Sequence, residues 1–394
     1  MSKTKYGALH YAIVLADWID QMPAAILFLL LTALVVQVGW TWHNVTHNII
    51  RASLLGVGLM TFILLDWTML TSLPRAKRSF GPVGVPLLAV AIVRWGLMIA
   101  AIYLPVSSTW TQAGVILSQC AISVAAWYAL WIEPFRLGVT RIEIESPKLA
   151  GFPPLRVLHL SDLHVERITL RERQLLKLVG ELHPDLIVFT GDFLNLSFTH
   201  DERAHADCRE VLAGLDAPMG VYAISGSPSV DPPQIVKELV DGLSVRRLDN
   251  RVEPIKLADD DEPALAIVGV TCTNNARQDG ETLQQVMATV PNNPSTPFTL
   301  LLYHTPDLMP QAAREQVNLY LCGHTHGGQI RLPFFGALLT SSCYWKRYEM
   351  GRYVEGNTTL YVSRGLGMEG KGAPRARFLC PPEIELFELR GPGK

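Results

Sequence analysis

The stretch that decides the fold of this 394-residue chain reads Leu319-Tyr320-Leu321-Cys322-Gly323-His324-Thr325-His326-Gly327-Gly328. Its four apolar residues suit one short buried strand, and the polar residues begin where that strand would end. The two histidines are two positions apart, so in extended backbone their side chains point to the same side. The flanking glycines allow a sharp turn and a close approach of the backbone to a ligand. The stretch therefore predicts a strand whose carboxyl end presents two imidazoles.

The same arrangement recurs along the chain, where short aliphatic runs are followed by Asp, His or small residues. We expect strands at 156–160, 185–190, 220–224, 298–303 and 319–322, and a helix at 170–182. The first four strands are followed by Ser161-Asp162-Leu163-His164, Gly191-Asp192, Ser225-Gly226-Ser227-Pro228 and His304. Strands that alternate with helices indicate an α/β domain with its site at the carboxyl ends of the strands. Imidazole and carboxylate together suit Mn, Fe or Zn, so the pattern predicts a metal site.

These motifs together resemble those of the calcineurin-like metallophosphoesterases. The resemblance runs from about Val157 to Leu389 and does not cover the apolar N-terminal region. It implies a four-layer αββα sandwich over residues 155–394. The His183-Pro184-Asp185 stretch and the Gly327 to Ile330 stretch resemble a subgroup that includes membrane-associated enzymes, among them UDP-2,3-diacylglucosamine pyrophosphatases.

The resemblance also implies which residues bind metal. One ion would be held by Asp162, His164, Asp192 and His326, and the second by Asp192, His304 and His324, with Asp192 bridging the two. These six are therefore the expected catalytic and metal-binding residues. In the family, two such ions activate a water for in-line attack on phosphorus and polarise the phosphoryl oxygens. The expected activity is metal-dependent hydrolysis of a phosphate ester or pyrophosphate, with a lipid-linked substrate in the membrane-associated subgroup.

The third motif of the family, Gly-Asn-His followed by Asp or Glu, is altered here to Gly226-Ser227-Pro228-Ser229. The Asn, a ligand of the second metal, is replaced by Ser227, whose hydroxyl is a poorer donor than an amide carbonyl. The His, which assists the transition state or leaving group, is replaced by Pro228. A general acid contributes about 10²- to 10⁴-fold in rate, so we expect a weakened second metal site and slower turnover. Two interpretations stay open: a metal-dependent hydrolase, or a catalytically impaired pseudo-phosphoesterase that acts as a membrane sensor or scaffold.

Other polar residues are candidates for compensating the altered motif or for contacting substrate. Asn195 lies three residues after Asp192, and His200 and His205 lie beyond it. As alternatives to such a role, an Asn in a loop usually forms a turn and a surface His is usually solvated. Arg364, in a Ser-Arg-Gly turn, could bind a substrate phosphate in bidentate fashion, or it could form an ion pair.

The N-terminal region, residues 1–134, carries most of the apolar residues that bring the hydrophobic content to 49%. Four of its stretches are long enough to cross a bilayer as helices. They are Pro23 to Trp40, Ala52 to Leu70, Gly84 to Leu104, and Thr111 to Ile132. Lys and Arg alternate in number between successive loops, which places both termini and the C-terminal domain in the cytoplasm. Residues 135–154 are expected to be a linker.

Two ionisable residues, Asp66 and Arg94, fall within the predicted spans. Such residues need a partner in the membrane, so we expect a structural ion pair, with contact to a substrate as the alternative. The net charge of −2 offers no basic patch for nucleic acid. The expected partners are the lipid bilayer and a phosphorylated small-molecule or lipid-linked substrate. The six cysteines show no CxxC spacing, which favours a reducing compartment.

Overall fold

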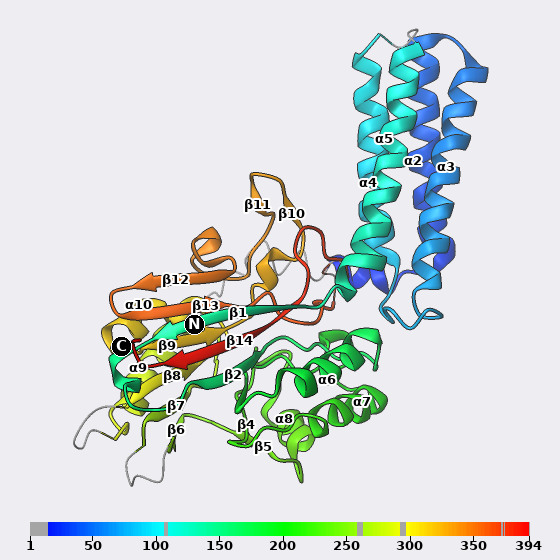
Figure 1. Ribbon diagram of the computed structural model, residues 1–394. Helices are drawn as coiled ribbons and strands as arrows, with labels where there is room; N and C mark the ends of the chain where they lie inside the picture. The colour runs from blue at the N-terminus through cyan, green and yellow to red at the C-terminus, as the bar shows by residue number, and fades with distance from the viewer. Residues whose placement is uncertain are drawn as a thin grey trace, which may run out of the picture. The chain divides into compact units, whose positions relative to one another are not determined.

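Four long helices make up most of the first of two structural units in the chain (Figure 1). The computed structural model describes residues 15–105, 109–257, 263–291, 297–371, 373 and 375–393. The first unit comprises Met1–Ile132 with Glu369–Arg375, and the second comprises Glu133–Met368 with Ala376–Lys394. The four helices are α2 (Ala24–Thr46), α3 (Ile49–Ser72), α4 (Gly84–Ala100) and α5 (Thr109–Trp127). All four are long and apolar enough to cross a membrane, as the sequence predicts.

Short segments with a different hydrogen-bonding pattern prolong two of these helices. A 3-10 turn, Ala101–Tyr103, follows α4, and a π-helical turn, Tyr128–Ile132, follows α5. Between α2 and α3 the chain reverses at His47, which has left-handed backbone (φ 51°). The side chain of Asn48 then accepts a hydrogen bond from the Arg51 amide and caps α3.

The predicted ion pair within the spans is present. Arg94 on α4 donates two hydrogen bonds to Asp66 on α3, at 2.7 and 2.9 Å. Its other donors reach the carbonyl and side chain of Gln119 and the hydroxyl of Ser123, both on α5. All five guanidinium N–H groups therefore have an acceptor, and the pair is buried. This saturation supports the structural role over a substrate contact.

Two six-stranded sheets form the centre of the second unit (Figure 1). The first sheet has the order β1-β14-β2-β3-β4-β5, and the second has the order β12-β13-β9-β8-β7-β6. The strands of the first sheet are β1 (Gly138–Glu145), β14 (Glu383–Arg390), β2 (Leu155–Leu160), β3 (Leu186–Phe189), β4 (Val221–Ala223) and β5 (Val245–Arg247). Those of the second are β12 (Gly351–Glu355), β13 (Thr358–Val362), β9 (Leu319–Cys322), β8 (Phe298–Leu302), β7 (Leu265–Gly269) and β6 (Arg251–Ile255). A separate hairpin pairs β10 (Arg331–Leu332) with β11 (Gly336–Ala337).

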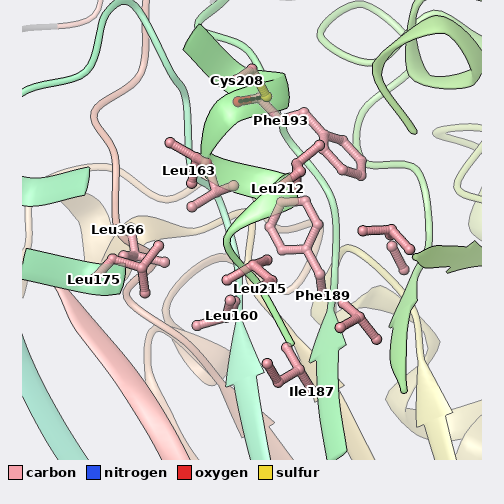
Figure 2. Packing of buried hydrophobic residues seen from close by; sticks show 14 of the residues in the cluster. Leu160, Leu163, Leu175, Ile187, Phe189, Phe193, Cys208, Leu212, Leu215 and Leu366 are labelled. Carbon is pink, nitrogen blue, oxygen red and sulfur yellow. Dashed lines mark hydrogen bonds between the residues drawn. The ribbon is translucent and has the colours of Figure 1, made fainter. Parts of the chain in front are cut away.

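Alternation along the strands sorts the buried residues into three apolar layers. Leu158 and Leu160 of β2 pack with α6 (Leu170–Leu182), α7 (Glu202–Ala213) and α8 (Pro233–Val240). Figure 2 shows this layer, in which the rings of Phe189 and Phe193 meet edge to face with centroids 4.4 Å apart. The opposite face of the first sheet packs on the second sheet. The outer face of the second sheet packs on α9 (Ala276–Met287) and α10 (Met309–Arg314). The predicted four-layer αββα sandwich is thus confirmed.

The segment 135–154, which the sequence presents as a linker, differs from that expectation. It contains β1, which pairs in parallel with β14 over its full length, from Gly138 with Glu383 to Glu145 with Arg390. Apolar and polar residues alternate only from Arg141 to Glu145, and most side chains of the strand are partly or fully exposed. The central strands are recognised by continuous apolar runs. Strand β1 has no such run, because it lies at the edge of the sheet and of its residues only Ile144 is buried.

Candidate metal centre

All six predicted ligands lie in loops that directly follow strands. Asp162 and His164 follow β2, Asp192 follows β3, His304 follows β8, and His324 and His326 follow β9. Strands β2 and β3 are parallel neighbours in the first sheet, and β8 and β9 are parallel neighbours in the second. The carboxyl ends of both pairs therefore deliver their side chains to one place, as the sequence predicts. All but His324 are fully buried.

The backbone at this centre is unusual, because five of the six residues have left-handed φ. The values are 52° for Asp162, 44° for His164, 60° for Asp192, 69° for His324 and 50° for His326. Residues with a Cβ rarely adopt this conformation, and it is concentrated at functional sites. Neighbouring glycines are required for the close packing: a Cβ on Gly226 would lie 2.1 Å from the Asp192 carboxylate oxygen.

The six side chains form two groups of three. In the first group, Asp162, His164 and His326 present ligand atoms that all lie within 4.8 Å of one another. The His164 Nε2 and His326 Nε2 atoms are 3.0 Å apart. Asp192, His304 and His324 form the second group by the same measure.

The two groups meet at one carboxylate. In the second group, His304 Nε2 is 3.1 Å from His324 Nδ1 and 3.3 Å from Asp192 Oδ2. The same Asp192 Oδ2 atom lies 3.6 Å from His164 Nε2 of the first group. Asp192 is therefore placed between the groups, as a bridging ligand must be.

The spacing of the imidazole nitrogens fits shared divalent ions. Ligand nitrogens lie about 2.0–2.1 Å from a zinc-sized ion. Two such nitrogens on one ion are then about 2.9–3.4 Å apart for octahedral to tetrahedral angles. The distances within the two histidine pairs, 3.0 and 3.1 Å, fall in this range. Nitrogen with carboxylate oxygen is also the donor set suited to Mn, Fe or Zn.

Burial keeps most of these imidazoles neutral, which is the form that binds metal. It lowers the pKa of His164 and of His324 to about 4, and that of His326 further below its usual value. His304 is the exception. Burial would lower its pKa, but the charges of Asp192 and Asp162 outweigh that effect and raise the pKa well above the usual value.

Hydrogen bonds outside the two groups orient the rings. His304 lies with Nδ1 2.8 Å from the Thr190 carbonyl oxygen, so this nitrogen donates and Nε2 is left as the ligand atom.

Burial raises the pKa of the Asp162 carboxyl to about 6, an effect that the nearby His304 opposes. The His324 amide hydrogen-bonds this carboxylate at 3.1 Å.

The altered third motif still reaches the centre. The Ser227 amide donates to Asp192 Oδ1 at 2.8 Å, and the Ser227 hydroxyl lies 3.4 Å from His324 Nδ1. Ser227 therefore stands beside the second group, where the resemblance places the family's Asn. The next residue, Pro228, has no group that can donate a proton.

Asp231 is a functional residue that the sequence reasoning misses. Its buried carboxylate accepts hydrogen bonds from the amides of Asp192 at 2.7 Å, Phe193 at 3.0 Å and Gly226 at 2.7 Å. It thereby ties the loop after β4 to the loop that carries Asp192. Burial, with a contribution from the Asp192 charge, raises the pKa of Asp231 to about 7. The available signal was an acidic residue two positions beyond the place where the family's motif has Asp or Glu.

A second missed residue, Arg377, is fully buried beside His326. Its guanidinium donates to the carbonyls of Arg364, Gly365, Gly367 and Cys380. One Nη also lies 3.4 Å from His326 Nδ1. Arg377 therefore holds the loop after β13 against the histidine. Sequence alone offers no signal for this role, because Arg377 follows no strand and belongs to no motif.

The other candidates are engaged elsewhere. Asn195 donates to the Met368 carbonyl and accepts from the Ser197 amide. His205 is paired with the Thr199 carbonyl at 2.7 Å, and His200 is exposed. Arg364 is held by Glu383, so of its two predicted roles the ion pair is the one present. These contacts give no support to compensation for the missing Asn and His.

The fold and the donor set define a domain of the phosphoesterase type, and sequence comparison identifies the family. No protein-family model matches the chain. The chain is 34% identical over 270 residues to YkuE, an uncharacterised metallophosphoesterase of Bacillus subtilis, with 67% of this chain and 89% of that protein covered. The chain therefore belongs to the metallophosphoesterases, a family that uses divalent metals.

Two further relatives bear on the membrane and on the substrate. The chain is 27% identical over 321 residues to LpxG, a UDP-2,3-diacylglucosamine pyrophosphatase of Chlamydia trachomatis, covering 68% of this chain and 94% of that protein. It is 28% identical over 247 residues to a transmembrane protein with a metallophosphoesterase domain from Bos taurus, covering 59% of this chain and 53% of that protein. With its four long apolar helices, the chain is a membrane protein of this family.

Proposed function

We propose that this protein hydrolyses a phosphate ester or pyrophosphate of a lipid-linked substrate at the cytoplasmic face of a membrane, using two divalent ions. The observation that carries the proposal is the position of Asp192. Its Oδ2 lies 3.6 Å from His164 in one ligand group and 3.3 Å from His304 in the other. A single carboxylate between two histidine-rich groups is the arrangement that two adjacent ions require.

Each proposed ligand has a defined place. The first ion would be held by Asp162, His164 and His326 with Asp192 beside them, and the second by Asp192, His304 and His324. The Ser227 hydroxyl is near enough to His324 to serve as a further, weaker ligand of the second ion. When bound, such ions supply an activated water and polarise the phosphoryl oxygens. The protein contributes a buried, pre-oriented set of donors, in which burial keeps His164, His324 and His326 neutral by lowering the pKa of each.

The substrate class follows from anchoring and relatives together. LpxG is named for a lipid-linked pyrophosphate substrate. In this chain the domain begins at Glu133, directly after the fourth apolar helix, so it is tethered to the bilayer. Tethering raises the effective concentration of membrane-embedded substrates at the site. The distribution of Lys and Arg between the loops supports a cytoplasmic domain carried on a multi-pass anchor.

A second candidate function rests on Pro228. With a proline where the family has a histidine, a group worth about 10²- to 10⁴-fold in rate is missing. In that case the site binds metal and phosphate without efficient turnover, and the protein acts as a membrane sensor or scaffold.

The test uses the purified full-length protein in three steps. Metal content is measured after dialysis, in the wild type, in Asp192→Ala and in Asp216→Ala, a matched change at an exposed aspartate. Hydrolysis of a phosphodiester, a phosphomonoester and a nucleotide-linked lipid is then assayed with added manganese. We expect metal to be retained by the wild type and by Asp216→Ala and lost from Asp192→Ala. Equal metal content in all three proteins would refute the assignment of Asp192.

Restoring the family's motif separates the two candidate functions. We expect Ser227→Asn combined with Pro228→His to raise phosphodiester turnover by about 10²-fold or more. Should the wild type already match the repaired variant, the missing groups are compensated and the sensor interpretation fails. An inactive wild type that binds metal and gains activity on repair would support it.

A further inference from the structure

The exposed apolar side chains of the second unit are concentrated in one place. Among its described residues, nine large apolar side chains are exposed. Seven of them belong to the β10–β11 hairpin, the segment after it, and the adjoining Leu379. We call these seven the apolar tip: Leu332, Phe334, Phe335, Leu338, Leu339, Trp345 and Leu379. Soluble surfaces rarely gather so many large apolar groups unless something covers them.

The shape of the hairpin presents these groups outward. Strands β10 and β11 are two residues each, joined by a three-residue turn, and Figure 1 shows the hairpin extending away from the two sheets. Phe334, at the turn, is fully exposed and has left-handed backbone with φ of 63°. Such a conformation is costly for an aromatic residue. The Phe334 ring is therefore kept exposed to solvent although its backbone conformation is unfavourable.

The charges around the apolar tip are suited to a lipid headgroup region. From Ile330 to Tyr348 the sequence contains Arg331, Lys346 and Arg347 and no acidic residue. The Lys346 ammonium lies 3.7 Å from the centre of the Phe335 ring. All three cations are paired with glutamates: Arg331 and Lys346 with Glu349, and Arg347 with Glu355. The apolar side chains therefore provide most of the attraction to lipid, and these ion pairs lie at the edge of the apolar surface. Aromatic, leucine and cationic residues together are typical of segments that lie in a membrane interface.

The hairpin and the segment after it are hydrogen-bonded to the loop that carries His324 and His326. Arg331 donates to the Gly327 carbonyl at 2.8 Å, one residue after His326. The Ser341 hydroxyl donates to the carbonyl of His324 at 2.9 Å. A hollow of about 670 Å³ adjoins the hairpin, and its lining includes the apolar Leu332, Phe335 and Leu379 together with the charged Arg331, Lys346, Arg347 and Glu349.

We infer that the apolar tip inserts into the bilayer interface and admits the apolar part of a membrane-embedded phosphate ester to the metal centre. The occupant is lipid, because the chain carries its own apolar spans and so always has a bilayer at hand. The hollow offers apolar walls for an acyl chain and paired charges for a polar headgroup. Arg331 and Ser341 hydrogen-bond to the backbone at Gly327 and His324, so the segment is held next to two of the metal ligands. The insertion stands on the hairpin alone, and only the delivery of substrate rests on the proposed function.

The experiment places a polarity-sensitive fluorophore at the tip of the full-length protein. Cys120 and Cys343, the exposed cysteines, are first replaced by serine. Phe334→Cys is labelled, and Leu170→Cys and Val354→Cys, at the two exposed apolar positions outside the apolar tip, are the matched controls. Each protein is reconstituted into vesicles of phosphatidylcholine and phosphatidylglycerol, with and without brominated acyl chains.

We expect the probe at position 334 to shift to shorter wavelength and to lose most of its emission with brominated lipid, while both controls stay unchanged. A probe at 334 that behaves like the controls would overturn the inference. A blue shift without quenching would also overturn it, because the tip would then be covered by protein, whether a second copy or another part of the chain. These readouts do not depend on activity, so they stand even if the proposed hydrolase function fails.

A kinetic arm tests the delivery of substrate. Leu338→Ser with Leu339→Ser, at two exposed residues of the apolar tip that do not line the hollow, should lower the turnover of a nucleotide-linked lipid in vesicles and leave hydrolysis of a soluble phosphodiester unchanged. Equal loss on both substrates would contradict the role in substrate delivery.

Discussion

Removing the Asp231 carboxylate should weaken the metal centre although Asp231 binds no metal. The carboxylate accepts three backbone hydrogen bonds, two of them from the residues Asp192 and Phe193 and the third from Gly226. In Asp231→Ala these three amides lose their partner inside a buried site. The loop that carries the bridging ligand and the loop that carries Ser227 then have one connection fewer, and both are free to shift.

The size of the effect follows from the number of bonds. A buried donor left without a partner costs about 1–3 kcal/mol. Three such donors would cost about 3–9 kcal/mol, and because water can occupy the space of the deleted carboxylate we expect the lower half, about 3–6 kcal/mol. Partners that orient a metal ligand are worth about 10- to 100-fold in metal affinity. Burial raises the pKa of Asp231 to about 7, so the carboxylate is fully ionised only above about pH 8.

Two measurements at that pH test this expectation on the full-length protein in detergent. Metal affinity is measured by competition with a chromogenic chelator, and unfolding of the domain is followed in denaturant. Asp216→Ala, at an exposed aspartate, is the control and should match the wild type. The reasoning is refuted if Asp231→Ala binds metal as tightly as the wild type and unfolds at the same denaturant concentration.

Three further outcomes are expected. An alkaline phosphatase fused after Lys394 should be inactive and a fluorescent protein fused there should be bright, because the loop charges place this end in the cytoplasm; an active phosphatase would reverse the orientation. Metal affinity, measured with the same chelator, should fall as the pH drops through about 6, because Asp162 has its pKa raised to about 6 by burial and must lose its proton to bind a cation; an affinity unchanged from pH 8 to pH 5 would contradict this. Arg94→Leu should destabilise the helical unit by about 3–5 kcal/mol by leaving Asp66 buried without its partner, and adding Asp66→Leu should recover most of the loss in thermal unfolding; equal melting of the single and double variants would contradict the pairing.

The sequence indicates where a site would lie because each of the six candidate ligands follows a strand, while the assignment of ligands to two ions comes from the family resemblance. The runs before Asp192 and before His324 are continuous and apolar, since both faces of their strands are buried between layers. The polar residue after the run is then at the edge of a sheet, where parallel strands bring their ends together. Local pattern therefore carries information about a site assembled from residues far apart in the chain.

The parts that the sequence does not predict are held by long-range contacts without a local pattern. Arg377 donates to backbone carbonyls that only the folded chain brings around it. Nothing in the sequence distinguishes it from any other arginine. Asp231 lies five residues after Gly226, and only the three-dimensional path of the loop returns it to Asp192. Strand β1 pairs with residues more than two hundred positions away, and no feature of residues 135–154 by themselves indicates that partner.

In the altered third motif the side chains differ from those of the family, but the loop that carries them still contacts the candidate metal centre. This observation bears on both proposed functions. A displaced loop would have lost contact with the centre, yet the Ser227 amide holds Asp192 Oδ1 at 2.8 Å and its hydroxyl faces His324. The adjacent Gly226 lies so close to Asp192 that even a Cβ would collide with the carboxylate. Asp231 fixes this loop from the other side. The backbone around the proposed metal centre thus follows the same path up to Ser227, and the two proposed functions differ in whether another group replaces the proton donor that is missing at Pro228.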